Sequence, residues 1–178
     1  MNMKKIAVIG VGNLLFCDDG IGIIAAEYLR QNFSFEPEVK IVDGGTLGFG
    51  LFEYFMEYEN VLILDTLSID VDVGTIYKIP SKELLGLGGY KKTAHEVEVV
   101  QMLEMCELYE TKAEVTLIGI VAKDVSSTKI GLSEVVQSRF EFLIQTVVKE
   151  LKNLGIEAVK KKTLDFDVIV NKLINFNR

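Results

Sequence analysis

Largely apolar runs alternate along this chain with stretches in which apolar residues recur at helical spacing. The runs are rich in Val, Ile and Leu and span residues 6–9, 39–42, 61–64 and 115–121, with Lys40 the one charged residue among them. All but the second have the composition typical of strands buried on both faces of a parallel sheet. The helical patterns span residues 20–33, 47–58, about 94–109 and 133–151. This order predicts an α/β fold with three layers, in which helices cover both faces of a twisted, mostly parallel sheet.

Two shorter strands and two helix starts complete this pattern. Residues 74–79 alternate in polarity and stop at Pro80, which favours a short, antiparallel strand. Residues 156–159 are the candidate for a last strand. Thr93 opens the capping-box pattern T-x-x-E, and Ser133 precedes the last long helical pattern, so we expect both residues to be helix N-caps.

The chain has 178 residues, which suits one domain with a substantial core. We assign residues 1–159 to a single α/β domain and residues 160–178 to a C-terminal extension. The extension begins with a basic run and continues with the spacing of an amphipathic helix. Packing on the domain surface is the simpler expectation for this helix, and a contact with a partner protein is the alternative.

Composition narrows the classes of function. The formal net charge of −7 argues against binding to nucleic acid or to an anionic membrane. No apolar stretch approaches the roughly 20 residues that span a bilayer, so membrane insertion is not expected. A signal-peptide pattern is missing from the start, and the two cysteines lack the spacing of a zinc or redox site. These features predict a cytoplasmic protein.

The loop after the first apolar run is the first candidate site. It contains Gly10 and Gly12 and then two carboxylates, Asp18 and Asp19, before a helical pattern starts. A strand, a turn and a helix start commonly hold a phosphate, but carboxylates would repel one. Residue 15 is leucine where a dinucleotide fingerprint needs glycine, so a nucleotide-binding domain is a weak alternative. A metal ligand from Asp18 or Asp19 is the better interpretation.

Further metal-ligating residues follow other elements. Asp43 follows the second apolar run and Asp65 the third, and ligands bind beyond the carboxyl ends of parallel strands. His95, the only histidine, falls in the first turn of the helix that Thr93 caps, where its neutral form is favoured. Two carboxylates and an imidazole match a transition metal with open coordination positions better than they match calcium or magnesium.

Each candidate residue also has a structural explanation. Asp18 or Asp19 could cap the following helix, Asp43 could stabilise a turn before two glycines, and a lone histidine is often a surface residue. Asp65 is harder to explain in this way, because an unpaired carboxylate at a buried strand end is costly. Their joint placement favours the metal site.

Other catalytic classes have little support. The acidic pair beside Cys17 should raise the pKa of its thiol and weaken it as a nucleophile. Cys106 falls within an apolar helical pattern and is expected to be a packing residue. The chain contains neither G-x-S-x-G nor H-E-x-x-H, so serine-hydrolase and ordinary zinc-protease motifs are missing.

Several segments resemble, in order, the motifs of the nickel-iron hydrogenase maturation endopeptidases. They are GVGNLLFCDDGIG, IVDGGT, LILDT, TAHEVEV, LIGIV and IGLS, and together they lie within residues 4–159. The resemblance implies a twisted sheet with helices on both faces. It also implies an endopeptidase that removes a C-terminal peptide from the precursor of a hydrogenase large subunit after nickel has been inserted.

The same resemblance implies roles for four residues. Asp19, Asp65 and His95 match the family's nickel ligands and catalytic positions, and Asp43 matches a position associated with substrate recognition. Nickel would be supplied by the large-subunit precursor, so we expect the isolated protein to be free of metal or to hold an adventitious ion. The competing hypothesis is a non-catalytic, metal-sensing or chaperone-like module that binds a hydrogenase subunit.

Overall fold

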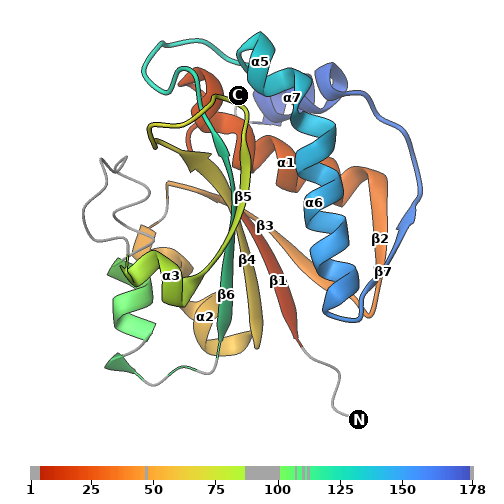
Figure 1. The fold of residues 1–178 in the computed structure, drawn as a ribbon. Coiled ribbons are helices and arrows are strands. Elements are labelled where there is room, and N and C mark those ends of the chain that lie inside the picture. Colours follow the sequence, from red (N-terminus) through yellow and green to blue (C-terminus); the bar gives the residue numbers. More distant parts are fainter. Residues whose placement is uncertain are drawn as a thin grey trace.

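The computed structural model describes residues 5–46, 48–86, 101–106, 108–109, 111 and 113–176 (Figure 1). Its central sheet has the strand order β3-β1-β4-β6-β5. The first four strands in this order are parallel and β5 is antiparallel to β6, as the alternating pattern before Pro80 predicts. In chain order the strands are β1 (Ile6–Val11), β3 (Val39–Gly45), β4 (Asn60–Leu67), β5 (Ile76–Pro80) and β6 (Glu114–Val121).

Helices cover both faces of this sheet, so the predicted three-layer α/β fold is confirmed (Figure 1). One face packs against α1 (Ile21–Asn32), α6 (Phe140–Asn153) and α7 (Phe166–Phe176). The other face packs against η2 (Gly48–Leu51), α2 (Phe52–Glu57) and the helical residues 101–106. A short helix, α3 (Ser81–Gly86), follows β5. No described helix is both long and apolar enough to cross a membrane.

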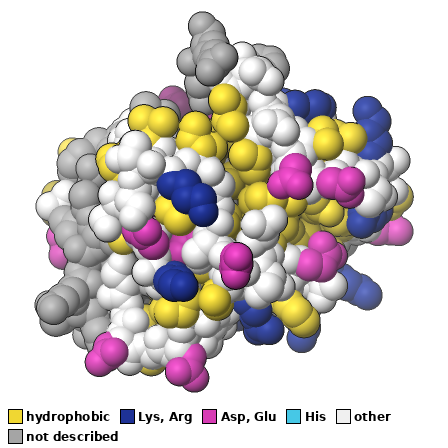
Figure 2. Space-filling view, turned by 90° about the horizontal axis from the view of Figure 1, so that it is seen from above, with side chains coloured by type: hydrophobic (Ala, Val, Ile, Leu, Met, Phe, Trp, Pro, Cys, Tyr) yellow, Lys and Arg dark blue, Asp and Glu magenta, His cyan; other side chains and the backbone are white. Residues whose placement is uncertain are grey.

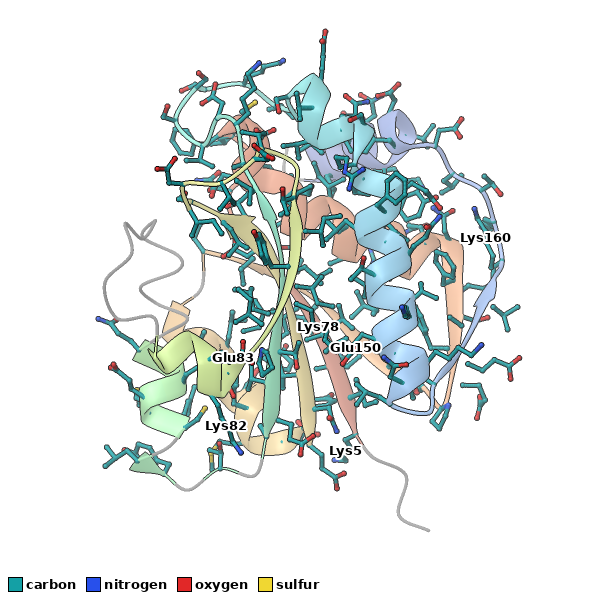
Figure 3. The ribbon with its side chains drawn as sticks, viewed as in Figure 1. Lys5, Lys78, Lys82, Glu83, Glu150 and Lys160 are labelled. Carbon is teal, nitrogen blue, oxygen red and sulfur yellow. The ribbon has the colours of Figure 1, made fainter. Side chains whose placement is uncertain are left out.

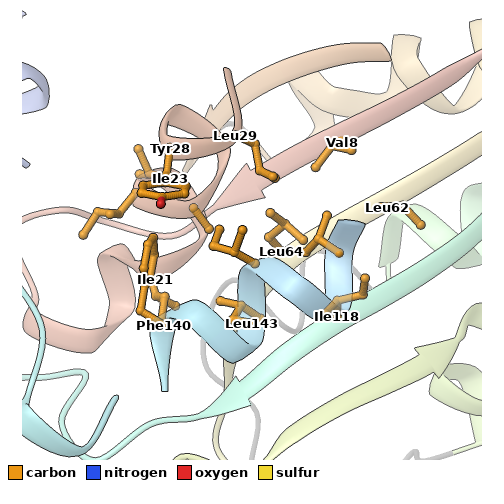
Figure 4. Close-up of a cluster of buried hydrophobic side chains, with 14 of the residues drawn as sticks. Val8, Ile21, Ile23, Tyr28, Leu29, Leu62, Leu64, Ile118, Phe140 and Leu143 are labelled. Atoms are coloured by element: carbon orange, nitrogen blue, oxygen red, sulfur yellow. The ribbon is translucent and has the colours of Figure 1, made fainter. Parts of the chain in front are cut away.

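The central strand β4 is buried along its whole length and contributes side chains to the hydrophobic cores on both faces of the sheet. Leu62 and Leu64 join the core against α1 and α6, where Figure 4 shows them beside Ile118 and Leu143. The alternate residues, including Ile63, join the core on the α2 face. Successive side chains of a strand point to opposite faces, so an unbroken apolar run is what a strand between two helical layers requires.

The long helical pattern over residues 133–151 forms two helices instead of one. α5 (Glu134–Ser138) ends at Arg139, and α6 starts immediately after it. The Arg139 side chain donates a 3.3 Å hydrogen bond to the carbonyl oxygen of Gly74 in the β4–β5 connection. Ser133 is the N-cap residue of α5, but its side chain makes no hydrogen bond to that helix. The segment 47–58 is likewise divided, into η2 and α2.

The predicted last strand forms, but it lies outside the central sheet. β7 (Glu157–Lys160) pairs antiparallel with β2 (Phe33–Glu36), a strand that was not predicted and that starts where the helical pattern over residues 20–33 ends. Asn32 ends α1 and is fully buried; its side chain accepts a hydrogen bond from Leu164 N–H and donates one to Leu164 O. These two hydrogen bonds hold the segment that follows β7 against the C-terminal end of α1.

The C-terminal helix α7 packs against α1. Its residues Ile169 and Leu173 are buried in the core on that face. The amphipathic spacing of the tail therefore corresponds to a helix that completes this core.

An ion pair joins the sheet to the neighbouring helix α6. Lys78 of β5 and Glu150 of α6 point toward one another, and their charged groups lie 3.0 Å apart (Figure 3).

Candidate active site

The first loop runs from the end of β1 through η1 (Cys17–Gly20) to α1. Gly12 has a φ of +130°, and a Cβ added to it would lie 1.8 Å from the carbonyl oxygen of Asp19. Its N–H donates to Gly45 O at 3.0 Å, and Asn13 N–H donates to Asp19 O at 3.1 Å. The glycine at position 12 therefore lets the turn close directly onto η1, which explains it without a bound phosphate.

Asp18 is fully buried, and both of its carboxylate oxygens accept hydrogen bonds. Oδ2 accepts from Lys123 N–H, Asp124 N–H and Ser133 Oγ–H, each at 2.9 Å, and Oδ1 accepts from Ser133 N–H at 2.6 Å. These donors belong to the connection between β6 and α5, residues 122–133. The lone pairs of this carboxylate are thus engaged inside the protein, which favours Asp19 over Asp18 as a candidate metal ligand.

Asp19 and Asp65 lie on elements that contact each other. Asp19 is 4% exposed and belongs to η1, which packs against β4. Asp65 is 1% exposed, lies within β4 opposite Gly119 of β6, and accepts a 2.7 Å hydrogen bond from Thr66 N–H at Oδ1. A Cβ on Gly22 would meet Leu64 O at 2.2 Å, so the start of α1 lies directly against this part of β4. The carboxyl edge of the sheet therefore carries two buried acidic residues on touching elements.

Asp43 lies at the same edge but on the other face of the sheet. It pairs with Gly10 and follows Val39 and Ile41 in the alternation of β3, so it faces α1, whereas Asp65 shares the face of Ile63. Asp43 lines a groove of about 400 Å³ between α1, β3 and α7. The structure therefore separates Asp43 from Asp65.

The charge of Asp43 is influenced by residues around that groove. Asp43 is exposed at the rim of the groove, but partial desolvation of its carboxyl raises the pKa, and the Glu27 carboxylate acts in the same direction. The N–H of Gly45, which donates to Asp43 Oδ1 at 3.0 Å, and the Arg30 guanidinium lower this pKa in part. Arg30 is itself held by Glu27, with a 2.8 Å hydrogen bond from Nε. The groove thus combines both signs of charge around an aspartate.

His95 and its expected N-cap Thr93 lie outside the described residues. Among the residues that are described, no group of three or more His, Cys, Asp or Glu side chains is arranged to hold a metal ion. Asp19 and Asp65 supply two carboxylates for such a site, and the contribution of His95 stays a prediction from the sequence.

Figure 2 shows the surface above the carboxyl edge of the sheet. On this surface, Asp and Glu side chains are scattered among basic and hydrophobic ones.

The cysteines are structural in this fold. Cys17 and Cys106 are both buried. Burial is the main cause that raises the pKa of each thiol, and the neighbouring Asp18 carboxylate raises that of Cys17 further. Neither thiol is therefore activated as a nucleophile. The predicted direction for the Cys17 thiol is confirmed for Asp18, although burial contributes more and the other acidic neighbour that raises this pKa is Asp124.

Sequence reasoning missed one component of this region. Ser133 was expected to cap a helix, but its N–H and hydroxyl both bind Asp18. The connection formed by residues 122–133 is thus hydrogen-bonded to the first loop, which carries Asp19. Its one sequence signal was the motif IGLS at residues 130–133, which ends on Ser133.

Comparison with known proteins identifies the family. Residues 23–150 match the family described as hydrogenase maturation protease. The chain belongs to the hydrogenase maturation protease family. It is therefore a peptidase, and this membership favours an enzyme over the non-catalytic module.

Individual relatives of this hydrogenase maturation protease agree with that assignment. It is 27% identical over 162 residues to the hydrogenase 2 maturation protease of Escherichia coli K12, covering 90% of this chain and 98% of the relative. It is 26% identical over 168 residues to the hydrogenase expression/formation protein HupD of Rhodobacter capsulatus, covering 93% and 80%.

Solved structures show that the fold is shared as well. The hydrogenase maturating endopeptidase HybD from E. coli superposes with a TM-score of 0.82 at 27% identity, covering 88% of this chain and 98% of that one. The [NiFe] hydrogenase maturation protease HybD from Thermococcus kodakarensis gives a TM-score of 0.68 at 26% identity, covering 82% and 98%. The α/β architecture of this maturation protease is therefore that of the family.

Proposed function

We propose that this protease removes a C-terminal peptide from the nickel-loaded precursor of a hydrogenase large subunit. The observation that carries the proposal is the placement of Asp19 and Asp65 in a chain of the maturation protease family. Both are buried, and they lie on touching elements at the carboxyl edge of the sheet. Buried carboxylates are stabilised by a cation, and nickel in the substrate would provide one.

In this proposal nickel belongs to the substrate. Asp19, Asp65 and His95 bind it with two carboxylate oxygens and one imidazole nitrogen, a donor set suited to a divalent transition metal. The protease thereby recognises a precursor into which nickel has been inserted. We expect the protein to fold without a metal of its own, since the described cores and sheet are built mainly from apolar side chains and backbone hydrogen bonds.

Peptide hydrolysis follows at the bound precursor. A water oxygen bonds to the carbonyl carbon, the C–N bond breaks, and the leaving amine takes up a proton derived from that water. A divalent metal beside the carbonyl can polarise it or lower the pKa of a bound water. Asp19, Asp65 and His95 would take part in catalysis by holding the metal in that position.

Asp43 serves a separate step in this proposal, the recognition of the precursor. It faces a groove that also contains Glu27, Arg30 and Lys172, so polar and charged groups of a polypeptide could bind there. The groove lies on the α1 face of the sheet, away from the face of Asp65. Substitution of Asp43 should therefore weaken precursor binding more than it slows cleavage.

The test is mass spectrometry of a nickel-loaded large-subunit precursor after incubation with the protease. The wild-type protein should shorten the precursor at its C-terminal end, whereas nickel-free precursor should stay intact. Asp65→Asn and His95→Ala should abolish the shortening without loss of the folded state, which circular dichroism would monitor. Asp167→Asn is the matched control, because Asp167 is an exposed carboxylate at the start of α7.

Two results would contradict the proposal. One is undiminished shortening by Asp65→Asn and His95→Ala. The other is tight binding of the precursor by the wild-type protein with no shortening, whether or not nickel has been loaded. That result would support the non-catalytic module.

A further inference from the structure

Asp18 is a buried carboxylate to which the proposed reaction assigns no role. It is fully inaccessible to solvent, and its backbone hydrogen-bond donors come from residues more than a hundred positions away. Lys123 N–H and Asp124 N–H bind Oδ2, Ser133 N–H binds Oδ1, and Ser133 Oγ–H also binds Oδ2. Burying a carboxylate is costly unless several such bonds compensate, so this arrangement is a specific structural device.

Backbone hydrogen bonds join the same two segments. Cys17 N–H donates to Lys129 O at 2.7 Å, and Lys129 N–H donates to Leu15 O at 3.0 Å. Asp18 N–H donates to Asp124 O at 2.9 Å. Cys17 has a φ of +44°, a left-handed conformation that side-chain-bearing residues adopt mainly where neighbouring contacts hold them. The first loop and the 122–133 connection therefore form one unit.

Asp19 is fixed by the turn that this unit holds. Its N–H donates to Phe16 O at 3.0 Å, and its carbonyl oxygen accepts from Asn13 N–H at 3.1 Å. Its neighbour Asp18 is anchored through both carboxylate oxygens, so the backbone on the N-terminal side of Asp19 cannot move without breaking those bonds. Metal-binding side chains need placement within a fraction of an ångström, which such a support provides.

We propose that Asp18 is a positioning residue that sets Asp19 for nickel capture by tying the first loop to residues 122–133. This inference rests on the proposed function in one respect, the assignment of Asp19 as a nickel ligand. The structural part, that Asp18 holds the loop around Asp19, stands independently of that assignment.

An amide cannot replace this carboxylate. Oδ1 and Oδ2 each accept a backbone N–H, so Asp18→Asn must direct its NH₂ group at a backbone donor in either orientation. The variant has nearly the volume of the wild-type side chain and leaves Asp19 unchanged in sequence. It therefore tests the hydrogen bonds of Asp18 separately from its packing.

Asn32→Ala is a matched control for lost stability. Asn32 is also fully buried, and its side chain also bonds to the backbone of a distant segment, through Leu164. It lies at the opposite end of α1 from the first loop. The two variants should be compared at a temperature below both unfolding midpoints, where both proteins are folded.

The first readout is amide hydrogen exchange, which requires no substrate. Asp18→Asn should accelerate exchange at Asn13, Asp19, Lys123 and Ser133 by about tenfold or more, because these amides then open locally. Asn32→Ala should leave those amides unchanged and accelerate Lys161 and Leu164. Should Asp18→Asn not fold, Ser133→Ala, which removes one donor, should show the same pattern at about two- to threefold. Unchanged exchange in the first loop would overturn the inference.

The second readout separates positioning from general destabilisation. The affinity of each variant is measured for nickel-loaded and for nickel-free precursor. Asp18→Asn should reduce the preference for the loaded form by about tenfold or more while binding nickel-free precursor normally, since a misplaced ligand affects only the metal contact. Asn32→Ala should keep the wild-type preference. Equal losses for both variants would refute the positioning role.

Failure of the proposed function gives a different result. A wild-type protein that neither cleaves the precursor nor prefers its loaded form would refute the nickel-dependent peptidase. The exchange pattern would then still decide whether Asp18 holds the loop around Asp19.

Discussion

The Ser133 N–H donates a 2.6 Å hydrogen bond to Oδ1 of Asp18, across 115 residues of sequence. This bond joins the loop after the first strand to the start of α5, so two segments that are distant in sequence meet beside Asp19. It also separates the roles of two adjacent carboxylates. Asp18 is engaged by backbone donors inside the protein, and Asp19 is the one proposed to bind the substrate's metal.

Substitution of Gly12 should lower the free energy of unfolding more than substitution of another glycine with positive φ. Gly12→Ala places a methyl group 1.8 Å from Asp19 O, so the backbone of η1 must shift, and we expect a loss of about 3 kcal/mol or more in the free energy of unfolding. Gly155→Ala has a φ of +89° but open space around it, so strain alone should cost about 1–2 kcal/mol. Urea denaturation measures both values, and equal losses would contradict the packing role of Gly12.

The pH dependence of stability should respond to Asp43 and Asp124 in opposite directions. The pKa of Asp43 is raised in the folded protein, mainly by partial desolvation of its carboxyl, so its ionisation opposes folding as the pH rises through and above the unfolded value of about 3.9. Asp43→Asn cannot ionise and avoids this loss. Its free energy of unfolding relative to wild type should therefore increase between about pH 3 and pH 7.

Asp124 provides the contrast. Hydrogen bonds from Ser127 and Ser126 lower the pKa of its carboxyl to about 2. A lowered pKa stabilises the fold above the unfolded value, and this contribution is lost as the pH falls toward 2. Asp124→Asn should therefore lose stability relative to wild type as the pH rises over the same range. Urea titrations at several pH values test both variants, and parallel trends would be inconsistent with these environments.

The C-terminal helix should contribute substantially to stability through one face. Ile169 is fully buried against the core that contains α1, so Ile169→Ala should cost about 2–5 kcal/mol. Val168, its neighbour, is 42% exposed, and Val168→Ala should change the free energy of unfolding by no more than about 0.5 kcal/mol. Chemical denaturation of the two variants distinguishes the faces. A small effect of Ile169→Ala would indicate that α7 is only loosely attached.

The fold was predictable because its signals are local. The parallel strands β1, β4 and β6 contain apolar runs between helical patterns, and the antiparallel β5 was predicted from its alternation and its closing proline. Two features depart from the local spacing, and both lie at contacts with distant segments. The helical pattern breaks at Arg139, whose side chain bonds to the carbonyl of Gly74, and the unpredicted strand β2 pairs with β7.

The sequence by itself determined the layered α/β architecture and the acidic residues near the carboxyl ends of the strands, since both follow from short-range periodicity. Only the tertiary structure decided which of two adjacent aspartates is held by the protein, because the donors to Asp18 lie at Lys123, Asp124 and Ser133. It also placed Asp43 and Asp65 on opposite faces. β4 is buried on both faces and carries no polar alternation, so its sequence cannot say which face Asp65 joins.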